Sequence, residues 1–275
     1  MSSAAELIAN YEGILLDAYG VLVDSQNPLP GAAELLSTLR AEGVAHYVVT
    51  NDASRLPETI AARLSAMGLG EVAADRIITS GSLLAPYFAD HALTGARCVV
   101  LGPKDSETYV RDAGGEIVPI DAQAECDVVV VCDEAGYEFL PSVDATLSAL
   151  FRRFDRGDDV RLVMPNPDLI YPKPAGAFGF TSGGAALLLE AGLDRRYPKR
   201  TLRFDRLGKP FPHIFNDAKR RAGSDNLLMI GDQLETDIAG ALAANIDAAL
   251  LCTGVTNWDE ADVSIKPTHV IDRLV

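Results

Sequence analysis

Short apolar segments alternate with helix-like segments at both ends of the chain, and this alternation restricts the possible folds more than any other feature. In the first part they follow one another at residues 13–17, 31–43, 45–51 and 57–68. The last part repeats the order at residues 201–205, 213–222, 226–232, 235–244 and 246–252. Strands that are apolar throughout and separated by helices indicate βαβ units and a parallel sheet covered on both faces. We therefore expect a doubly wound α/β core built from both ends of the chain.

The middle of the chain has strands and helices of its own. Its expected strands lie at residues 97–102, 127–133 and 160–166, and its expected helices at residues 141–151 and 183–191. Loop composition near residues 80–81 and the polar segment 194–200 suggest boundaries. We predict a discontinuous core domain of residues 1–80 and 196–275, with a second α/β domain inserted at residues 81–195.

The charge balance narrows the possible partners. The 275 residues contain 24 Lys and Arg against 39 Asp and Glu, which gives a formal net charge of −15. Such a surface repels phosphate backbones and anionic lipids, so we expect neither nucleic acid nor a membrane as a partner. The first residues lack the pattern of a secretory leader, and we expect a cytoplasmic protein. A small anionic substrate would need local positive charge, for example from a metal ion.

Polar side chains stand where the expected core strands end. They are Asp17, Thr50, Asn51, Asp52, Lys209, Asp232 and Asp237. Taken singly, each has an ordinary interpretation as a cap, a turn residue or a solvated charge. Ligands of open α/β sheets bind beyond the carboxyl ends of the strands, so these side chains should converge on one site.

The chemistry of the set favours phosphoryl transfer. Asp17, Asp232 and Asp237 gathered at one edge would repel one another unless a cation lay between them. An all-oxygen ligand set suits Mg²⁺, which usually keeps several waters for a phosphate to replace. Thr50 would supply a hydroxyl donor, and Lys209 a positive charge. A carboxylate that attacks in line would complete the requirements of the reaction.

Four ordered motifs resemble those of the haloacid dehalogenase (HAD) superfamily. They are D-A-Y-G-V-L-V-D at residues 17–24, V-V-T-N-D at 48–52, G-K-P at 208–210 and G-D-Q-L-E-T-D-I at 231–238. An insertion between the second and third motifs is similar to the class IIA arrangement of the p-nitrophenylphosphatase-like enzymes, whose cap is itself α/β. The N-P-D segment at residues 166–168 also resembles that subgroup. The resemblance covers nearly the whole chain and implies a HAD core with an inserted α/β cap.

The resemblance also implies roles for individual residues. Asp17 would be the nucleophile that forms an aspartyl-phosphate, and would also bind Mg²⁺ together with Asp232, Asp237 and the backbone carbonyl of Tyr19. Thr50 and Asn51, with the amide of Asp52, would hold the phosphate, and Lys209 would neutralise charge. The implied substrate is a small phosphorylated metabolite, such as a sugar or polyol phosphate. Similar proteins suggest a possible homodimer.

Tyr19 departs from the family pattern, in which an Asp usually stands two positions after the nucleophile and acts as acid and base. A phenol, with an ordinary pKa of about 10, donates a proton but is a poor acceptor at neutral pH. Loss of a positioned acid/base costs roughly 10²–10⁴-fold in rate. Turnover of ordinary esters is therefore expected to be slow unless another carboxylate, with Asp52 nearest in sequence, takes over the role.

Two alternatives remain open at this point. D-A-Y-G is also the first motif of the 2-haloacid dehalogenases, in which the leaving halide needs no proton. Those enzymes, however, use no metal and lack an acidic pair such as Asp232 and Asp237. The other alternative is a catalytically quiet protein that binds a phosphorylated metabolite or a partner protein without turnover.

The inserted domain should select the substrate. Its candidates for substrate contact are Asn166, Asp168, Tyr171 and Lys173, within N-P-D-L-I-Y-P-K-P. Two prolines before a glycine-rich stretch predict a shaped loop here rather than a helix. A simple linker between the two domains is an equally good interpretation of the individual side chains.

Overall fold

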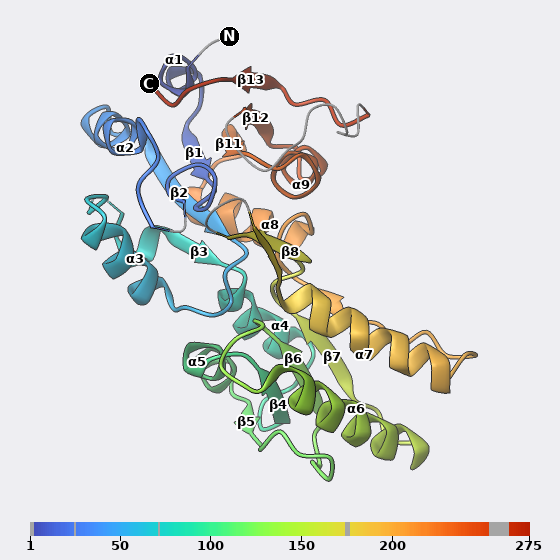
Figure 1. Ribbon diagram of the computed structural model, residues 1–275. Coiled ribbons are helices and arrows are strands. Elements are labelled where there is room, and N and C mark those ends of the chain that lie inside the picture. The colour runs from blue at the N-terminus through green and yellow to red at the C-terminus, as the bar shows by residue number, and fades with distance from the viewer. Residues whose placement is uncertain (1–2, 25, 71, 174–176, 253–263) are drawn as a thin grey trace. The chain divides into compact units, whose positions relative to one another are not determined.

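The chain folds into two compact units (Figure 1). The computed structural model describes residues 3–24, 26–70, 72–173, 177–252 and 264–275. The first unit, here called the core unit, comprises Met1–Thr50, Pro57–Thr79 and Lys209–Val275. The second, the inserted unit, comprises Asn51–Leu56 and Ser80–Gly208. The predicted insertion of one α/β domain into another is thus matched by the observed division, although the boundaries differ.

The core unit is built on a parallel sheet. Its strands are β1 (Gly13–Leu16), β2 (Ala45–Thr50), β3 (Ile77–Thr79), β11 (Leu227–Gly231), β12 (Asp247–Leu251) and β13 (His269–Ile271). Among the described residues they lie in the order β13-β12-β11-β1-β2-β3, and every neighbouring pair is parallel. The carboxyl ends of β1, β2 and β11 are therefore adjacent, as the doubly wound prediction requires.

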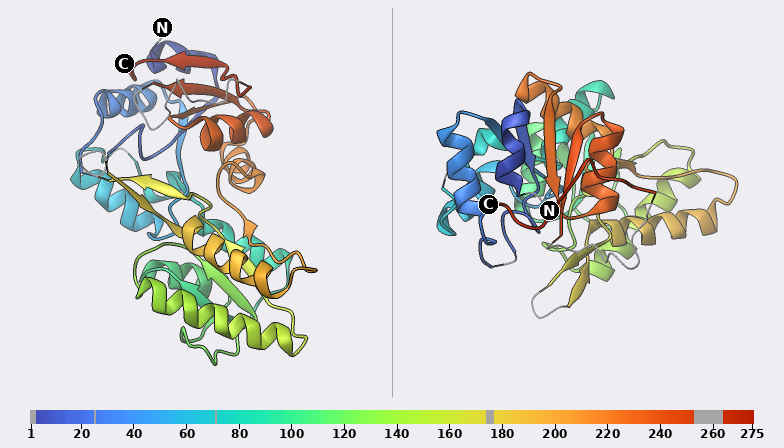
Figure 2. Two further views of the ribbon diagram at one scale, coloured as in Figure 1. Left: turned by 45° about the vertical axis from the view of Figure 1, so that its right-hand side comes forward. Right: turned by 90° about the horizontal axis from the view of Figure 1, so that it is seen from above.

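Helices cover both faces of this sheet, which explains why its central strands β1 and β11 are apolar and buried along their whole length. They are α1 (Ala4–Leu7), α2 (Ala32–Ala41), α3 (Pro57–Ala66), α8 (Pro212–Ala222) and α9 (Ala239–Ala243), with short turns η1 (Ile8–Asn10), η2 (Ala74–Arg76) and η5 (Leu234–Ile238). The apolar sides of α1, α2 and α3 share one core cluster with β1, β2 and β11. The helices α8 and α9 contact the sheet from the other face, as the right-hand view of Figure 2 shows for the blue and orange-red helices.

The inserted unit repeats the α/β pattern. Its strands are β4 (Arg97–Leu101), β5 (Glu116–Ile117), β6 (Val128–Val131), β7 (Arg161–Met164) and β10 (Asp205–Arg206), and its helices are η3 (Gly81–Leu83), α4 (Leu84–Asp90), α5 (Lys104–Asp112), α6 (Phe139–Asp155) and α7 (Ser182–Arg196). Within the described residues these strands form a parallel sheet in the order β10-β7-β6-β4-β5. Apolar residues of α6 and α7 pack on β4, β6 and β7 to form a second hydrophobic core.

Two expectations about the inserted part need correction. The segment 201–205 was expected to be a core strand, but only its last residue is in a strand, and that strand, β10, pairs with β7 of the inserted unit. This pairing places residues 196–208 in the inserted unit rather than in the core. The predicted shaped loop after Asn166 contains an antiparallel hairpin of β8 (Ile170–Pro172) and β9 (Phe178–Phe180). The sequence did not predict these strands, because the segment is rich in Pro and Gly, and both residue types disfavour strands.

In the parts of the chain that the structure describes, no helix combines the length and the apolar character needed to cross a membrane.

Candidate active site

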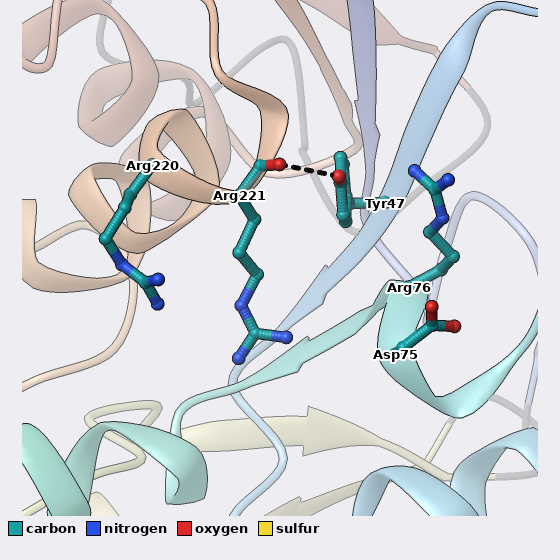
Figure 3. Close-up of a pocket in the computed structure, with 5 residues that line it drawn as sticks. All are labelled: Tyr47, Asp75, Arg76, Arg220 and Arg221. Carbon is teal, nitrogen blue, oxygen red and sulfur yellow. Dashed lines mark hydrogen bonds between the residues drawn. The ribbon is translucent and has the colours of Figure 1, made fainter.

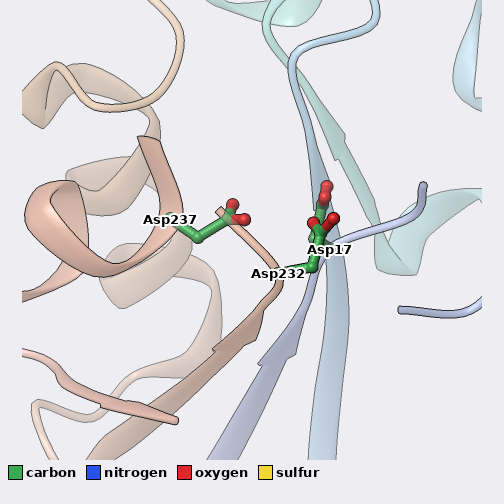
Figure 4. Close-up of side chains that lie close together, drawn as sticks. All are labelled: Asp17, Asp232 and Asp237. Carbon is green, nitrogen blue, oxygen red and sulfur yellow. The ribbon is translucent and has the colours of Figure 1, made fainter. Parts of the chain in front are cut away.

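The carboxyl ends of β1 and β11 bring three aspartates together. Asp17 directly follows β1, Asp232 directly follows β11, and Asp237 lies in η5. One carboxylate oxygen from each can be chosen so that all three lie within 4.8 Å of one another. Figure 4 shows Asp237 reaching from η5 toward the strand ends that carry the other two. All three side chains are buried, so water does not screen their mutual repulsion well.

Lys209 supplies the compensating positive charge. Its Nζ donates to Oδ1 of Asp17 at 2.7 Å and to Oδ1 of Asp237 at 2.6 Å. The lysine is 3 % exposed. Burial lowers the pKa of Lys209, but the charges of Asp17 and Asp237 more than offset this and leave that pKa above its ordinary value. The lysine therefore stays charged, and it pairs with two of the three carboxylates, those of Asp17 and Asp237.

The pKa of Asp17 indicates that the site lacks positive charge. Burial raises the pKa of Asp17 well above its usual range, and repulsion from Asp237 and Asp232 adds to this, while Lys209 opposes it. A divalent ion among these oxygens would favour the ionised form of the carboxylates. Three carboxylate donors without nitrogen or sulfur ligands suit a hard cation, so the residues present fit Mg²⁺.

Two glycines make room for the aspartates. A Cβ at Gly20, where φ is +91°, would lie 2.2 Å from Oδ2 of Asp232. A Cβ at Gly231 would lie 2.2 Å from Cβ of Asp237. Both glycines stand inside the motifs that carry the family resemblance, but their steric role was not predicted. The signal was a glycine directly beside a candidate ligand, which often marks close approach.

Tyr19 is held by a residue that sequence reasoning missed. Nη1 of Arg63, on α3, donates to the Tyr19 hydroxyl, and the guanidinium carbon lies 5.5 Å from the centroid of the tyrosine ring. The phenol packs against the core cluster and is partly buried. An arginine has no acceptor, so the hydroxyl hydrogen of Tyr19 is not used in this bond.

The other predicted residues divide between the units. Thr50 ends β2 in the core unit and is buried, whereas Asn51 begins the inserted unit. Nδ2 of Asn51 donates to Oδ1 of Asp168 at 2.9 Å, so two predicted substrate residues contact each other directly. Asn166 accepts the amide of Asp168 at 3.0 Å through its Oδ1. These two hydrogen bonds link the three residues within the inserted unit.

Asp52 has a capping role. Its Oδ1 accepts from the amide and hydroxyl of Ser54 and from the amide of Arg55, at 2.7, 2.8 and 3.1 Å. Its Oδ2 pairs with Nη1 of Arg55 at 2.8 Å. This pattern is typical of an aspartate that shapes a turn. These contacts give no support to Asp52 as the replacement acid/base.

Comparisons with known proteins decide the family. Residues 14–116 match the model of the haloacid dehalogenase-like hydrolases, and residues 206–275 match a HAD-hydrolase-like family. A crystal structure of a possible sugar phosphatase of the HAD superfamily from Cytophaga hutchinsonii is 31% identical, with a TM-score of 0.86, over 99% of this chain and 97% of the other. The chain belongs to the HAD superfamily. Its inserted α/β unit is consistent with the cap of class IIA, and the chain is a hydrolase of the phosphatase type.

Other relatives align over most of their length. A dihydroxyacetone phosphatase from Corynebacterium glutamicum is 29% identical over 94% of this chain and 88% of the relative. A glycerol phosphate phosphatase from Mycobacterium tuberculosis, solved in complex with magnesium, is 25% identical with a TM-score of 0.79, over 98% of this chain and 76% of the other. These relatives agree with the predicted family and with phosphatase chemistry.

Proposed function

We propose that this HAD protein hydrolyses small phosphate monoesters, such as sugar or polyol phosphates, with Mg²⁺ as cofactor and with Asp17 as nucleophile. The observation that carries the proposal is the buried group of Asp17, Asp232 and Asp237 around Lys209. Burying three carboxylates is costly without compensation, and a purely structural role would be served better by apolar side chains. The named phosphatase relatives support the same class of reaction.

Each residue has a chemical role in this proposal. Oxygen of the Asp17 carboxylate forms a bond to phosphorus while the bond from phosphorus to the ester oxygen breaks. Lys209 stabilises the charge that develops on the phosphoryl oxygens, and the hydroxyl of Thr50 donates to one of them. Mg²⁺ would be held by Asp17, Asp232, Asp237 and the carbonyl of Tyr19, and would neutralise the phosphoryl charge. Water then cleaves the phosphate from Asp17.

The leaving oxygen needs a proton, and we assign this role to the hydroxyl of Tyr19. Arg63 donates to the phenol oxygen and thereby supports transfer of the phenol proton to a leaving alkoxide. Activation of water in the second step needs a free base, and a phenol is almost fully protonated at neutral pH, whereas a carboxylate is ionised. We therefore expect slow turnover of alkyl esters.

Asn51, Asn166 and Asp168 are proposed as the substrate-selecting group of the inserted unit. The contact between Asn51 and Asp168 orients two hydrogen-bonding side chains. The expected homodimer, cytoplasmic location and absence of nucleic-acid partners stay predictions.

The test is a panel of phosphate esters assayed for phosphate release with Mg²⁺ and with EDTA, for the wild type and for Asp17→Asn. We expect magnesium-dependent release that the variant lowers by at least ~10⁴-fold, because an amide cannot act as the nucleophile. Release by Asp17→Asn at the wild-type rate would end the proposed role. Chloride release from a 2-haloacid without Mg²⁺ would favour a dehalogenase. Binding of esters without turnover would favour the quiet binder.

A further inference from the structure

A pocket of about 410 Å³ opens on the core unit away from the aspartates (Figure 3). It is lined by Tyr47, Asp75, Arg76, Arg220 and Arg221. Arg76 ends η2 immediately before β3, and Tyr47 is the third residue of β2, whose last residue is Thr50. Three residues of strand span about 10 Å. The pocket therefore lies toward the amino ends of these strands, whereas the three aspartates lie at the carboxyl ends.

Arg76 is oriented but carries no ion pair with a described residue. Its guanidinium carbon lies 5.0 Å from the centroid of the Tyr47 ring, a cation–π distance. This contact leaves the hydrogen-bond donors of the guanidinium available. Asp75, beside it, is exposed and makes no ion pair within the described part of the chain.

Arg221 is fixed from two sides. Its Nε donates to Oδ2 of Asp217 at 2.8 Å, and its backbone carbonyl accepts the Tyr47 hydroxyl at 2.8 Å. Its side chain is 27% exposed. Among the described residues its two terminal nitrogens have no hydrogen-bond acceptor, and Figure 3 shows them at the free end of the side chain. Arg220 shares Asp217 through one terminal nitrogen.

The surroundings of this pocket are rich in positive charge, whereas the chain as a whole is negatively charged. Three arginines face one lining carboxylate and the shared Asp217, in a protein of net charge −15. Arginines in the last turn of α8 also offset the helix dipole. That role requires their charge but not the free terminal nitrogens of Arg221, nor the stacking of Arg76 on Tyr47.

We propose that this pocket binds a phosphate dianion, either free or carried by a small metabolite, at a second site separate from Asp17. Arginine presents paired donors that match the oxygens of a phosphate group. Arg76 and Arg221 lie on different elements and both contact Tyr47, so this residue joins the two sides of the site. The volume lies within the usual range of ligand pockets. The inference goes beyond hydrolysis at Asp17 and does not depend on it.

The experiment titrates the full-length protein with inorganic phosphate and, separately, with glycerol 2-phosphate. EDTA is present, so that the aspartate cluster holds no metal and repels anions. Calorimetry gives the affinity, and the Nε–Hε signals of labelled arginines locate the ligand. We expect saturable binding that shifts the Arg76 and Arg221 signals. Arg76→Gln and Arg221→Gln should each weaken binding about tenfold, since each removes a charge-assisted pair of hydrogen bonds.

Matched variants separate a built site from general charge. Arg111→Gln removes an exposed arginine of α5 that is paired with Glu107, and should leave the affinity within about twofold. Arg76→Lys keeps the charge without the fork and should bind more weakly than wild type but more tightly than Arg76→Gln. Thermal unfolding checks that each variant is folded.

Two results would overturn the proposal. One is the absence of saturable binding of either probe up to roughly 20 mM, a concentration that would detect even weak specific sites. The other is equal weakening by Arg111→Gln and Arg221→Gln, which would assign the binding to net charge. Tighter binding of glycerol 2-phosphate would identify a phosphorylated metabolite as the ligand, and tighter binding of inorganic phosphate would identify the free ion. Loss of phosphate release at Asp17 is measured separately and bears on neither result.

Discussion

The two units contain the same kind of parallel sheet but end their strands differently. In the inserted unit, Asp133 follows β6 closely and its Oδ1 accepts the amide of Ala135 at 2.9 Å, while Asn166 after β7 accepts the amide of Asp168. Each of these side chains is used in its own turn. In the core unit, Asp17 and Asp232 follow β1 and β11, and their carboxylates lie close to that of Asp237, while Lys209 pairs with Asp17 and Asp237.

The difference teaches how a strand-end residue becomes a site. A polar residue after a parallel strand is common, because the chain must turn there and the turn needs hydrogen bonds. Turns satisfied in this way need no compensating cation. The buried carboxylates of the core unit repel one another and are stable only when a cation compensates their charge. This need for a cation indicates a functional site.

Of the changes considered, removal of Lys209 should destabilise the core unit most. Lys209→Met leaves Asp17 and Asp237 buried without their cation, so we expect the free energy of unfolding to fall by about 3–5 kcal/mol. Urea denaturation at pH 8 in EDTA measures it. Lys219→Met is the control, since the partner Asp225 has an 88% exposed side chain and such a pair contributes about 0–1 kcal/mol. Equal losses for the two variants would contradict the distinction.

Metal removal should have the next largest effect. With EDTA, phosphate release should fall by roughly 10²–10³-fold and return on addition of Mg²⁺, because several kcal/mol of charge stabilisation are lost. Mg²⁺ should also raise the midpoint of thermal unfolding of the wild type. Asp232→Asn should reduce that rise. If Mg²⁺ changed neither the activity nor the thermal stability of the wild type, the proposed metal site at the three aspartates would be contradicted.

A carboxylate at residue 19 should supply the base that the core-unit site lacks. Tyr19→Asp should raise kcat for alkyl phosphates by about 10–100-fold, since a carboxylate can accept a proton at neutral pH. Tyr19→Phe serves as the control and should not exceed the wild-type rate. An unchanged rate in Tyr19→Asp would mean that another group already supplies the acid/base.

A neutral side chain at Asp133 should show that the inserted unit does not need its strand-end charge. Burial raises the pKa of Asp133 to about 6, above its value in the unfolded chain. The folded state therefore binds the proton more tightly, and stability falls as pH rises from about 4 to about 6. Asp133→Asn should remove this fall and increase the free energy of unfolding at pH 7.5 by about 1–2 kcal/mol.

The matched measurement uses pH 4, where the two proteins should have similar stability. Asp144→Asn, on the exposed side of α6, controls for loss of one carboxylate and should change stability by less than about 0.5 kcal/mol. A destabilised Asp133→Asn at pH 7.5 would show that the charge itself is used.

Much of the fold was predictable because buried strands have a local signature. The runs at residues 13–17 and 226–232 are apolar except at their polar end residues, and the observed β1 and β11 differ from them by a residue at one or both ends. The hairpin of β8 and β9 was not predictable, because its sequence has no alternation and contains Pro and Gly. The segment 235–244, predicted as one α-helix, instead begins with the π turn η5, which carries Asp237.

By itself, the sequence determined the alternation of buried strands and helices and the residue types that end the strands, because both follow from local periodicity and chain direction. The tertiary structure alone decided which of those residues meet. Lys209 contacts Asp17 across 192 positions of sequence, Arg63 holds the hydroxyl of Tyr19, and Asp52 is used in a turn. Such contacts depend on how separate elements pack together, and no short stretch of sequence records that packing.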